Sequence, residues 1–169
     1  MTPATALAML FLLRKVVRYT NAVVAEIVSL REAIAGLVRD GDTVALEGFT
    51  HLIPFAAGHE IIRQGRRRLT LVRMTPDVIY DQVIGMGCVS RLVFSWGGNP
   101  GVGSLHRVRD AVERQWPQPL ALTEFTHAEL ALGYQAGASG MTCALMPHHA
   151  GTDLERVPGA SRAPSRGPW

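Results

Sequence analysis

The sequence contains little cysteine and little charge for its length. Its two cysteines, Cys88 and Cys143, lie far apart and form no Cys-x-x-Cys pattern. They therefore predict buried, reduced thiols of a cytosolic protein, not a disulfide or a zinc site. Charged residues make up 18% of the 169 residues and hydrophobic residues 47%. That balance excludes a disordered chain and provides enough apolar residues for one domain with a sizeable core.

Familiar catalytic and metal-binding motifs are also missing. The sequence has no Gly-x-Ser-x-Gly nucleophile elbow and no P-loop. Asp77 and Asp81 lie four apart in a predicted helix, and we expect both to face solvent. The histidines have no metal-ligand spacing with partner acids, which predicts surface or loop positions and no metal site. They are His51, His59, His106, His127, His148 and His149.

The basic residues are unevenly spread. The net charge is only +3 and the pI about 9.3, but five arginines fall within Arg63–Arg73 and another group within Arg156–Arg166. Such clusters can hold phosphates, including those of a nucleotide cofactor. The interleaved lysine and aromatic residues of a nucleic-acid face are missing. We therefore expect a solvated surface run and no nucleic-acid partner.

The N-terminal residues carry a short apolar stretch. Residues 4–13 read ATALAMLFLL and are followed by Arg14 and Lys15. The stretch is shorter than the roughly 20 residues that span a bilayer, and a signal peptide has its positive charge before the apolar stretch. We interpret residues 1–28 as an N-terminal extension, such as an upstream extension of the reading frame, with a membrane-surface helix as the alternative.

From Ser29 onward, apolar residues predict alternating helices and strands. Ser29 and Glu32 have capping-box spacing, Gly41 is a predicted helix stop, and Pro54 suits the first position of a helix that Gly65 closes. The predicted strands cover residues 43–46, 69–74, 91–96, 119–125 and 141–146, and the helices begin near residues 29, 54, 76, 105 and 127.

This alternation predicts an α/β fold whose mainly parallel sheet has helices on both faces. Ligands of such sheets bind outside the carboxyl ends of the strands. The loops after Leu46, Met74, Trp96, Phe125 and Met146 are therefore the candidate binding loops. After Met146 the periodicity stops, and residues 151–169 predict a disordered tail.

The loop GGNPGVGS, residues 97–104, follows a predicted strand and opens a helix. Gly98, Gly101 and Gly103 do not have the Gly-x-Gly-x-x-Gly spacing of a dinucleotide-binding fingerprint. The backbone N–H groups at this helix start can bind an anion, or the loop can be a tight turn without a ligand. A Rossmann-type nucleotide-binding module is thus an alternative that the glycine spacing disfavours.

The loop after the first strand carries the most specific pattern. Gly48 allows close approach of the backbone to a ligand, Phe49 supplies an apolar wall, and Thr50 with free N–H groups before Pro54 can hold a carboxylate or a thioester oxygen. The order Asp-Gly-Asp, short strand, Gly-Phe, proline and helix in Asp40–Val72 resembles the α (A-type) subunit of class I CoA-transferases, with that of glutaconate CoA-transferase as the nearest type.

This resemblance extends from about Ser29 to Met146 and has several implications. It implies a CoA-transferase (NagB-like) fold whose C-terminal half is missing, so residues 29–150 are expected to form a partial α-subunit domain. It implies a cytoplasmic hetero-oligomer with a β subunit that carries the catalytic glutamate, and no membrane partner. The substrates would be an acyl-CoA and a carboxylic acid, with coenzyme A as substrate and no other cofactor. An inactive truncated fragment is a further alternative.

The resemblance also indicates candidate site residues. Glu47 stands where the family has the first glycine of Gly-Gly-Phe. It is either a nucleophile or, as we favour, a pocket-lining or salt-bridged loop residue. Glu124 is a second candidate catalytic carboxylate, or a neighbour of the helix cap at Thr126. The candidate substrate-binding residues are Gly48, Phe49, Thr50, Pro54, Gly98, Asn99 and Gly101.

Overall fold

A computed structural model describes residues 26–48, 52–98, 103–142 and 144 of the chain. Most of the expected N-terminal extension (1–28), the expected tail (151–169) and most of the expected strand at 141–146 lie outside these residues. The longest described helix has 12 residues. None of the described helices is long and apolar enough to cross a membrane.

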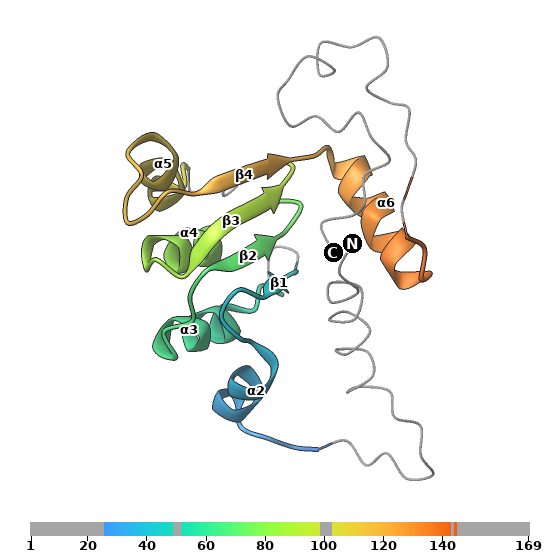
Figure 1. Ribbon diagram of the computed structural model, residues 1–169, viewed down its shortest axis with the longest axis horizontal. Helices are drawn as coiled ribbons and strands as arrows, with labels where there is room; N and C mark the ends of the chain where they lie inside the picture. The colour runs from blue at the N-terminus through green and yellow to red at the C-terminus, as the bar shows by residue number, and fades with distance from the viewer. Residues whose placement is uncertain (1–25, 49–51, 99–102, 143, 145–169) are drawn as a thin grey trace.

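Helices and strands alternate along the described chain, as the sequence predicts (Figure 1). Each observed element lies within a few residues of the predicted one, and the differences are confined to the ends. The elements are α2 (Leu30–Leu37), β1 (Thr43–Ala45), α3 (Phe55–Arg63), β2 (Leu69–Val72), α4 (Val78–Gly85), β3 (Val89–Phe94), α5 (His106–Glu113), β4 (Ala121–Glu124) and α6 (His127–Ala138).

The four described strands form one parallel sheet in the order β1-β2-β3-β4. Because parallel crossovers are right-handed, consecutive steps in one direction place the connecting helices α3, α4 and α5 on the same face. The α6 helix follows β4 and packs against the other face, where its Leu130 contacts Val72 and Val93. Figure 1 shows α6 beside the arrowheads of the strands. The prediction of an α/β fold with helices on both faces is therefore confirmed.

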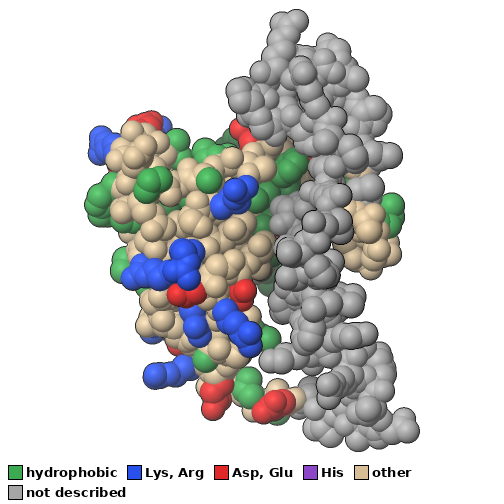
Figure 2. Space-filling model, in the orientation of Figure 1, with side chains coloured by type: hydrophobic (Ala, Val, Ile, Leu, Met, Phe, Trp, Pro, Cys, Tyr) green, Lys and Arg blue, Asp and Glu red, His purple; other side chains and the backbone are tan. Residues whose placement is uncertain are grey.

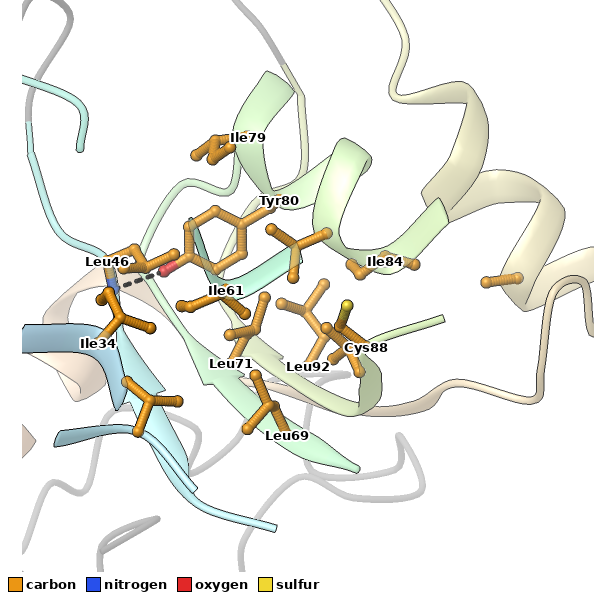
Figure 3. Packing of buried hydrophobic residues seen from close by; sticks show 14 residues of the cluster. Ile34, Leu46, Ile61, Leu69, Leu71, Ile79, Tyr80, Ile84, Cys88 and Leu92 are labelled. Carbon is orange, nitrogen blue, oxygen red and sulfur yellow. Dashed lines mark hydrogen bonds between the residues drawn. The ribbon is translucent and has the colours of Figure 1, made fainter. Parts of the chain in front are cut away.

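The main core lies between the sheet and helices α2 to α5. Leu71 and Leu92 from the strands meet Ile61 of α3 and Tyr80 of α4, and all four are almost fully buried (Figure 3). The Tyr80 hydroxyl accepts the N–H of Leu46 at 3.0 Å and donates to the carbonyl of Val72 at 2.8 Å. A buried hydroxyl needs such partners, so Tyr80 joins α4 to the carboxyl ends of β1 and β2.

The expected helix ends are confirmed in part. Ser29 and Glu32 form the predicted capping box, and Gly65 follows α3 with φ +64°. The prediction of Gly41 as the stop of the first helix is wrong, because α2 ends at Leu37 and Val38 is already extended. Pro54 is the residue before α3 rather than its first residue, since the helix begins at Phe55.

The arginines before β2 make specific contacts with other elements. Arg66 donates to the carbonyl of Ala35, and Arg67 donates to the carbonyls of Met86 and Gly87 behind α4. These residues precede Leu69 and so lie at the amino ends of the strands, where Figure 2 shows basic side chains gathered away from α6. The expectation of a purely solvated run is therefore too simple. Guanidinium groups of this run also donate hydrogen bonds to backbone carbonyls near helix ends, and their stems pack along the surface.

Two helical glycines provide a matched test of this packing. A Cβ at Gly58 in α3 would overlap the fully buried side chain of Ile79, whereas a Cβ at Gly36 in α2 meets nothing within 4 Å. We expect Gly58→Ala to lower the free energy of unfolding by about 1–3 kcal/mol. Gly36→Ala should leave it unchanged or raise it by up to about 1 kcal/mol through helix propensity. Urea denaturation of both variants measures the difference, and equal stabilities would contradict the described contact between α3 and α4.

Candidate functional site

Polar side chains from separate segments meet at the carboxyl ends of the strands. Glu47 follows β1, Arg73 and Thr75 follow β2, and Ser95 follows β3. His127 is the first residue of α6. This is the edge at which parallel α/β sheets bind ligands, and it is the edge that the sequence predicts.

Arg73 is buried at the centre of this edge, and its side chain is only 5% exposed. Its guanidinium forms an ion pair with Asp77 at 2.9 Å and donates to the carbonyl of Gly48 at 2.6 Å. A longer contact of 3.4 Å reaches the carbonyl of Leu46, and the group lies over the Tyr80 ring, 5.5 Å from its centroid. A buried charge requires this number of partners, so Arg73 ties the backbone after β1 to β2 and α4.

Asp77 is buried, contrary to the expectation that it faces solvent, and Asp81 is half-buried. Asp77 is 5% exposed, and its carboxylate both caps α4, accepting the N–H of Ile79 at 3.2 Å, and pairs with Arg73. Asp81 accepts the N–H groups of Arg107 and Val108 in the first turn of α5. Both carboxylates therefore satisfy N–H groups at helix starts that have no partner within the helix.

The carboxylate of Glu47 has partners from the residues that follow β2 and from α6. It accepts the hydroxyl of Tyr134 at 2.7 Å and the N–H of Met74 at 3.3 Å, and it lies 3.8 Å from Nε of Arg73. Burial, together with this hydrogen bond to an anion, raises the pKa of Tyr134, so the phenol stays a neutral donor. The structure thus places Glu47 in an ion pair, and its role in catalysis stays a prediction.

His127 joins three segments of the chain. Its Nδ1 lies 2.8 Å from the hydroxyl of Ser95, and its Nε2 lies 3.0 Å from the hydroxyl of Thr75. The Ser95 hydroxyl already donates its proton to the carbonyl of Met74 at 2.6 Å. Nδ1 must therefore donate to Ser95, and in the neutral ring Nε2 accepts from Thr75. His127 is exposed, as expected of a surface histidine, but its ring nitrogens are engaged in this network.

Sequence reasoning does not identify Arg73, Tyr134 or the network of His127. In the sequence Arg73 is one member of a basic run, and Tyr134 lies inside a helix without a motif. The available signal is positional, because the loops after Met74, Trp96 and Phe125 are predicted binding loops. Within α6, His127, Leu130 and Tyr134 have i, i+3, i+7 spacing, which places all three on the face toward the sheet.

Position 48 requires glycine because of a close contact within the chain. A Cβ at this position would overlap the backbone carbonyl of Leu52, so the backbone of Leu52 lies directly against Gly48. The sequence predicts that Gly48 allows close approach of a ligand. The structure describes instead a close approach of one backbone segment to another, and contact with a ligand stays a prediction.

The other predicted site residues are only partly described. Phe49, Thr50, Asn99 and Gly101 lie outside the described residues. Pro54 lies at the end of the loop before α3, and Gly98 is buried after β3 with its N–H bonded to the carbonyl of Pro76. Their contacts with a substrate stay predictions.

Glu124 and Glu47 are not brought together. Glu124 is exposed at the end of β4, opposite Phe94 in the sheet register. The strands β1 and β4 are separated by β2 and β3, so the backbones of these two strands are about 14 Å apart at a strand spacing of about 4.8 Å. The expectation that Thr126 caps the next helix is confirmed, since its hydroxyl accepts the N–H of Glu129.

Within the described residues, no group of three His, Cys, Asp or Glu side chains could hold a metal ion.

Comparison with known proteins gives similar chains with CoA-transferase names. The chain is 64% identical over 133 residues to the A-type subunit of 3-oxoadipate CoA-transferase from Pseudomonas knackmussii, covering 79% of this chain and 47% of that protein. It is 31% identical over 120 residues to the A-type subunit of glutaconate CoA-transferase from Acidaminococcus fermentans, covering 69% and 36%. No family model matches the sequence. The chain therefore spans less than half the length of these curated relatives.

Two solved structures are similar to this chain in fold. The crystal structure of glutaconate coenzyme A-transferase from Acidaminococcus fermentans superposes with a TM-score of 0.73 at 29% identity, over 80% of this chain and 42% of that chain. A single-residue variant of the decarboxylase AibA/AibB superposes with a TM-score of 0.67 at 26% identity, over 76% and 49%.

Two ion pairs with the same i, i+4 spacing test the energetic importance of Arg73. The side chains of Arg73 and Asp77 are 5% and 7% exposed, whereas those of Arg109 and Glu113 are 58% and 60% exposed. Arg73→Ala leaves a buried carboxylate unpaired and should lower the free energy of unfolding by about 3–5 kcal/mol. Arg109→Ala should cost less than about 1 kcal/mol. Similar losses for both variants, measured by urea denaturation, would show that Arg73 is not the buried anchor described here.

Proposed function

We propose that this chain, which belongs to the α-subunit family of class I CoA-transferases, works with a β subunit to move coenzyme A from an acyl-CoA to a free carboxylic acid. The observation that carries the proposal is the high identity with the CoA-transferase chain from Pseudomonas knackmussii. The superposition on glutaconate coenzyme A-transferase supports it at the level of the backbone.

We propose a dicarboxylic acid as the acceptor, with 3-oxoadipate as the first compound to test. The two curated relatives are named for 3-oxoadipate and for glutaconate, and both compounds are dicarboxylic acids. The much higher identity with the 3-oxoadipate relative favours that compound.

The reaction would proceed by covalent catalysis on a glutamate of the β subunit. Its carboxylate attacks the thioester carbonyl and releases the CoA thiolate, which leaves a mixed anhydride between glutamate and acyl group. The thiolate then attacks the glutamyl carbonyl and releases the carboxylate of the first acid, giving a glutamyl-CoA thioester. The same two steps in reverse with the acceptor acid complete the transfer. Coenzyme A takes part as a substrate, and the proposed steps need no other cofactor.

The contribution of this chain would come from the carboxyl ends of its strands. In this proposal the loop after Ala45, with Gly48, lines the acyl pocket and offers N–H donors to the oxyanion that develops during each attack. The contacts of Glu47 with Tyr134, Met74 and Arg73 occupy its carboxylate. This occupation favours a supporting role for Glu47 and leaves the nucleophile to the β subunit. We also propose that the protein is cytoplasmic.

The test is reconstitution with a β subunit that carries the candidate glutamate. Acyl-CoA donors are offered with 3-oxoadipate, glutaconate and acetate, and the new CoA thioester is measured by mass spectrometry. We expect transfer to a dicarboxylic acid by the complex and none by the chain alone, because the proposed nucleophile belongs to the β subunit. Turnover by the chain alone, or saturable binding of NAD with no transfer by the complex, would contradict the proposal.

A further inference from the structure

We propose that Tyr134 and Glu47 form a pair of positioning residues through which α6 fixes the first residues of the loop after β1. The inference rests on the proposed function, because it assigns these residues to the orientation of a loop in the transferase site. It assigns neither of them to bond making. The described residues Leu46, Glu47 and Gly48 carry the argument.

The backbone of these three residues is held from the side of β2 and α4. Arg73 donates to the carbonyls of Leu46 and Gly48, and the Tyr80 hydroxyl accepts the N–H of Leu46. Both side chains are almost fully buried. The path of the chain out of β1 is therefore tied to the core on one side.

The carboxylate of Glu47 supplies the connection on the other side. Arg73 uses its Nη atoms for Asp77 and the two carbonyls, and its Nε faces Glu47 at 3.8 Å. This separation exceeds the 2.7–3.2 Å of a hydrogen bond between N–H and oxygen. The short contact of Glu47 is the 2.7 Å hydrogen bond from Tyr134, and a bond from a neutral donor to a carboxylate is a strong one.

The α6 helix is itself well anchored, so it can act as a fixed support. Its first turn is held by His127 through Thr75 and Ser95. Its buried Leu130 packs against Val72 and Val93. Tyr134 projects from the same helix face one turn after Leu130 and reaches Glu47. The helix thus connects the end of β4 with the end of β1 across the sheet.

The experiment measures the reconstituted complex with variants at both positions. Tyr134→Phe and Glu47→Ala each remove the hydrogen bond, whereas Glu47→Gln keeps an oxygen that can accept it. We expect the first two to lower kcat by about tenfold with KM changed less than about twofold, since a hydrogen bond to a charged group is of that magnitude. The double variant should lose no more than either single variant. Glu47→Gln should retain turnover within about threefold of the unchanged complex.

Gln135→Ala is the matched control, because Gln135 is an exposed neighbour on the same helix. It should leave kcat unchanged. Hydrogen–deuterium exchange of the amides of Leu46–Gly48 gives a readout that does not require activity. We expect these amides to exchange several-fold faster in Tyr134→Phe than in Gln135→Ala, while the amides of β2 and β3 stay protected.

The outcomes separate this inference from the proposed function. Absence of turnover in the complex without substitutions would overturn the proposed function. The hydrogen–deuterium exchange rates would still decide whether Tyr134 fixes the loop. Loss of all turnover in Glu47→Gln would identify Glu47 as a nucleophile and overturn the inference. Additive losses in the double variant, or unchanged exchange in Tyr134→Phe, would also overturn it.

Discussion

The buried positive charge of Arg73 is the constraint on which the carboxyl edge of the sheet depends. A guanidinium group that is 5% exposed has lost nearly all of its hydration, so its partners must be built into the fold. Asp77 provides the counter-charge from the start of α4, and the carbonyls of Leu46 and Gly48 provide acceptors from the chain after β1. The hydrogen bonds and the ion pair that Arg73 requires thereby fix the ends of β1 and β2 and the start of α4 relative to one another.

The elements of the fold can be predicted from the sequence because their signals are local. Ser29 and Glu32 cap a helix within four residues, and the apolar strands Leu69–Val72 and Val89–Phe94 are bounded by glycines and helices. Short apolar strands alternating with helices leave few arrangements other than a parallel sheet. The errors are equally local. The sequence predicts a helix end at Gly41 that in fact lies at Leu37, because a glycine suits a later turn as well as a helix stop.

The candidate site can be placed at the right edge from the sequence, but its contacts cannot. Nothing in a basic run distinguishes Arg73, which points into the core, from Arg68, which lies in solvent. The shortest contact of Glu47 is with Tyr134, 87 positions along the chain, and no spacing rule reaches that far. The cap that Asp77 forms on α4 is a local contact, but its pairing with Arg73 becomes visible only when the helix is placed against the sheet.

The sequential order of the strands has a consequence for the assembly of this edge during folding. Each described strand pairs with its nearest neighbour in the chain, so these strands and the helices on their first face can associate through contacts of smaller sequence separation than the contact that joins α6 to the end of β1. The contact between Glu47 and Tyr134 closes a much longer loop and requires α6 to lie against the other face of these strands. On a ribosome the strands can therefore associate while the edge that would receive a ligand is still open, and this edge is completed only after the last described helix has emerged.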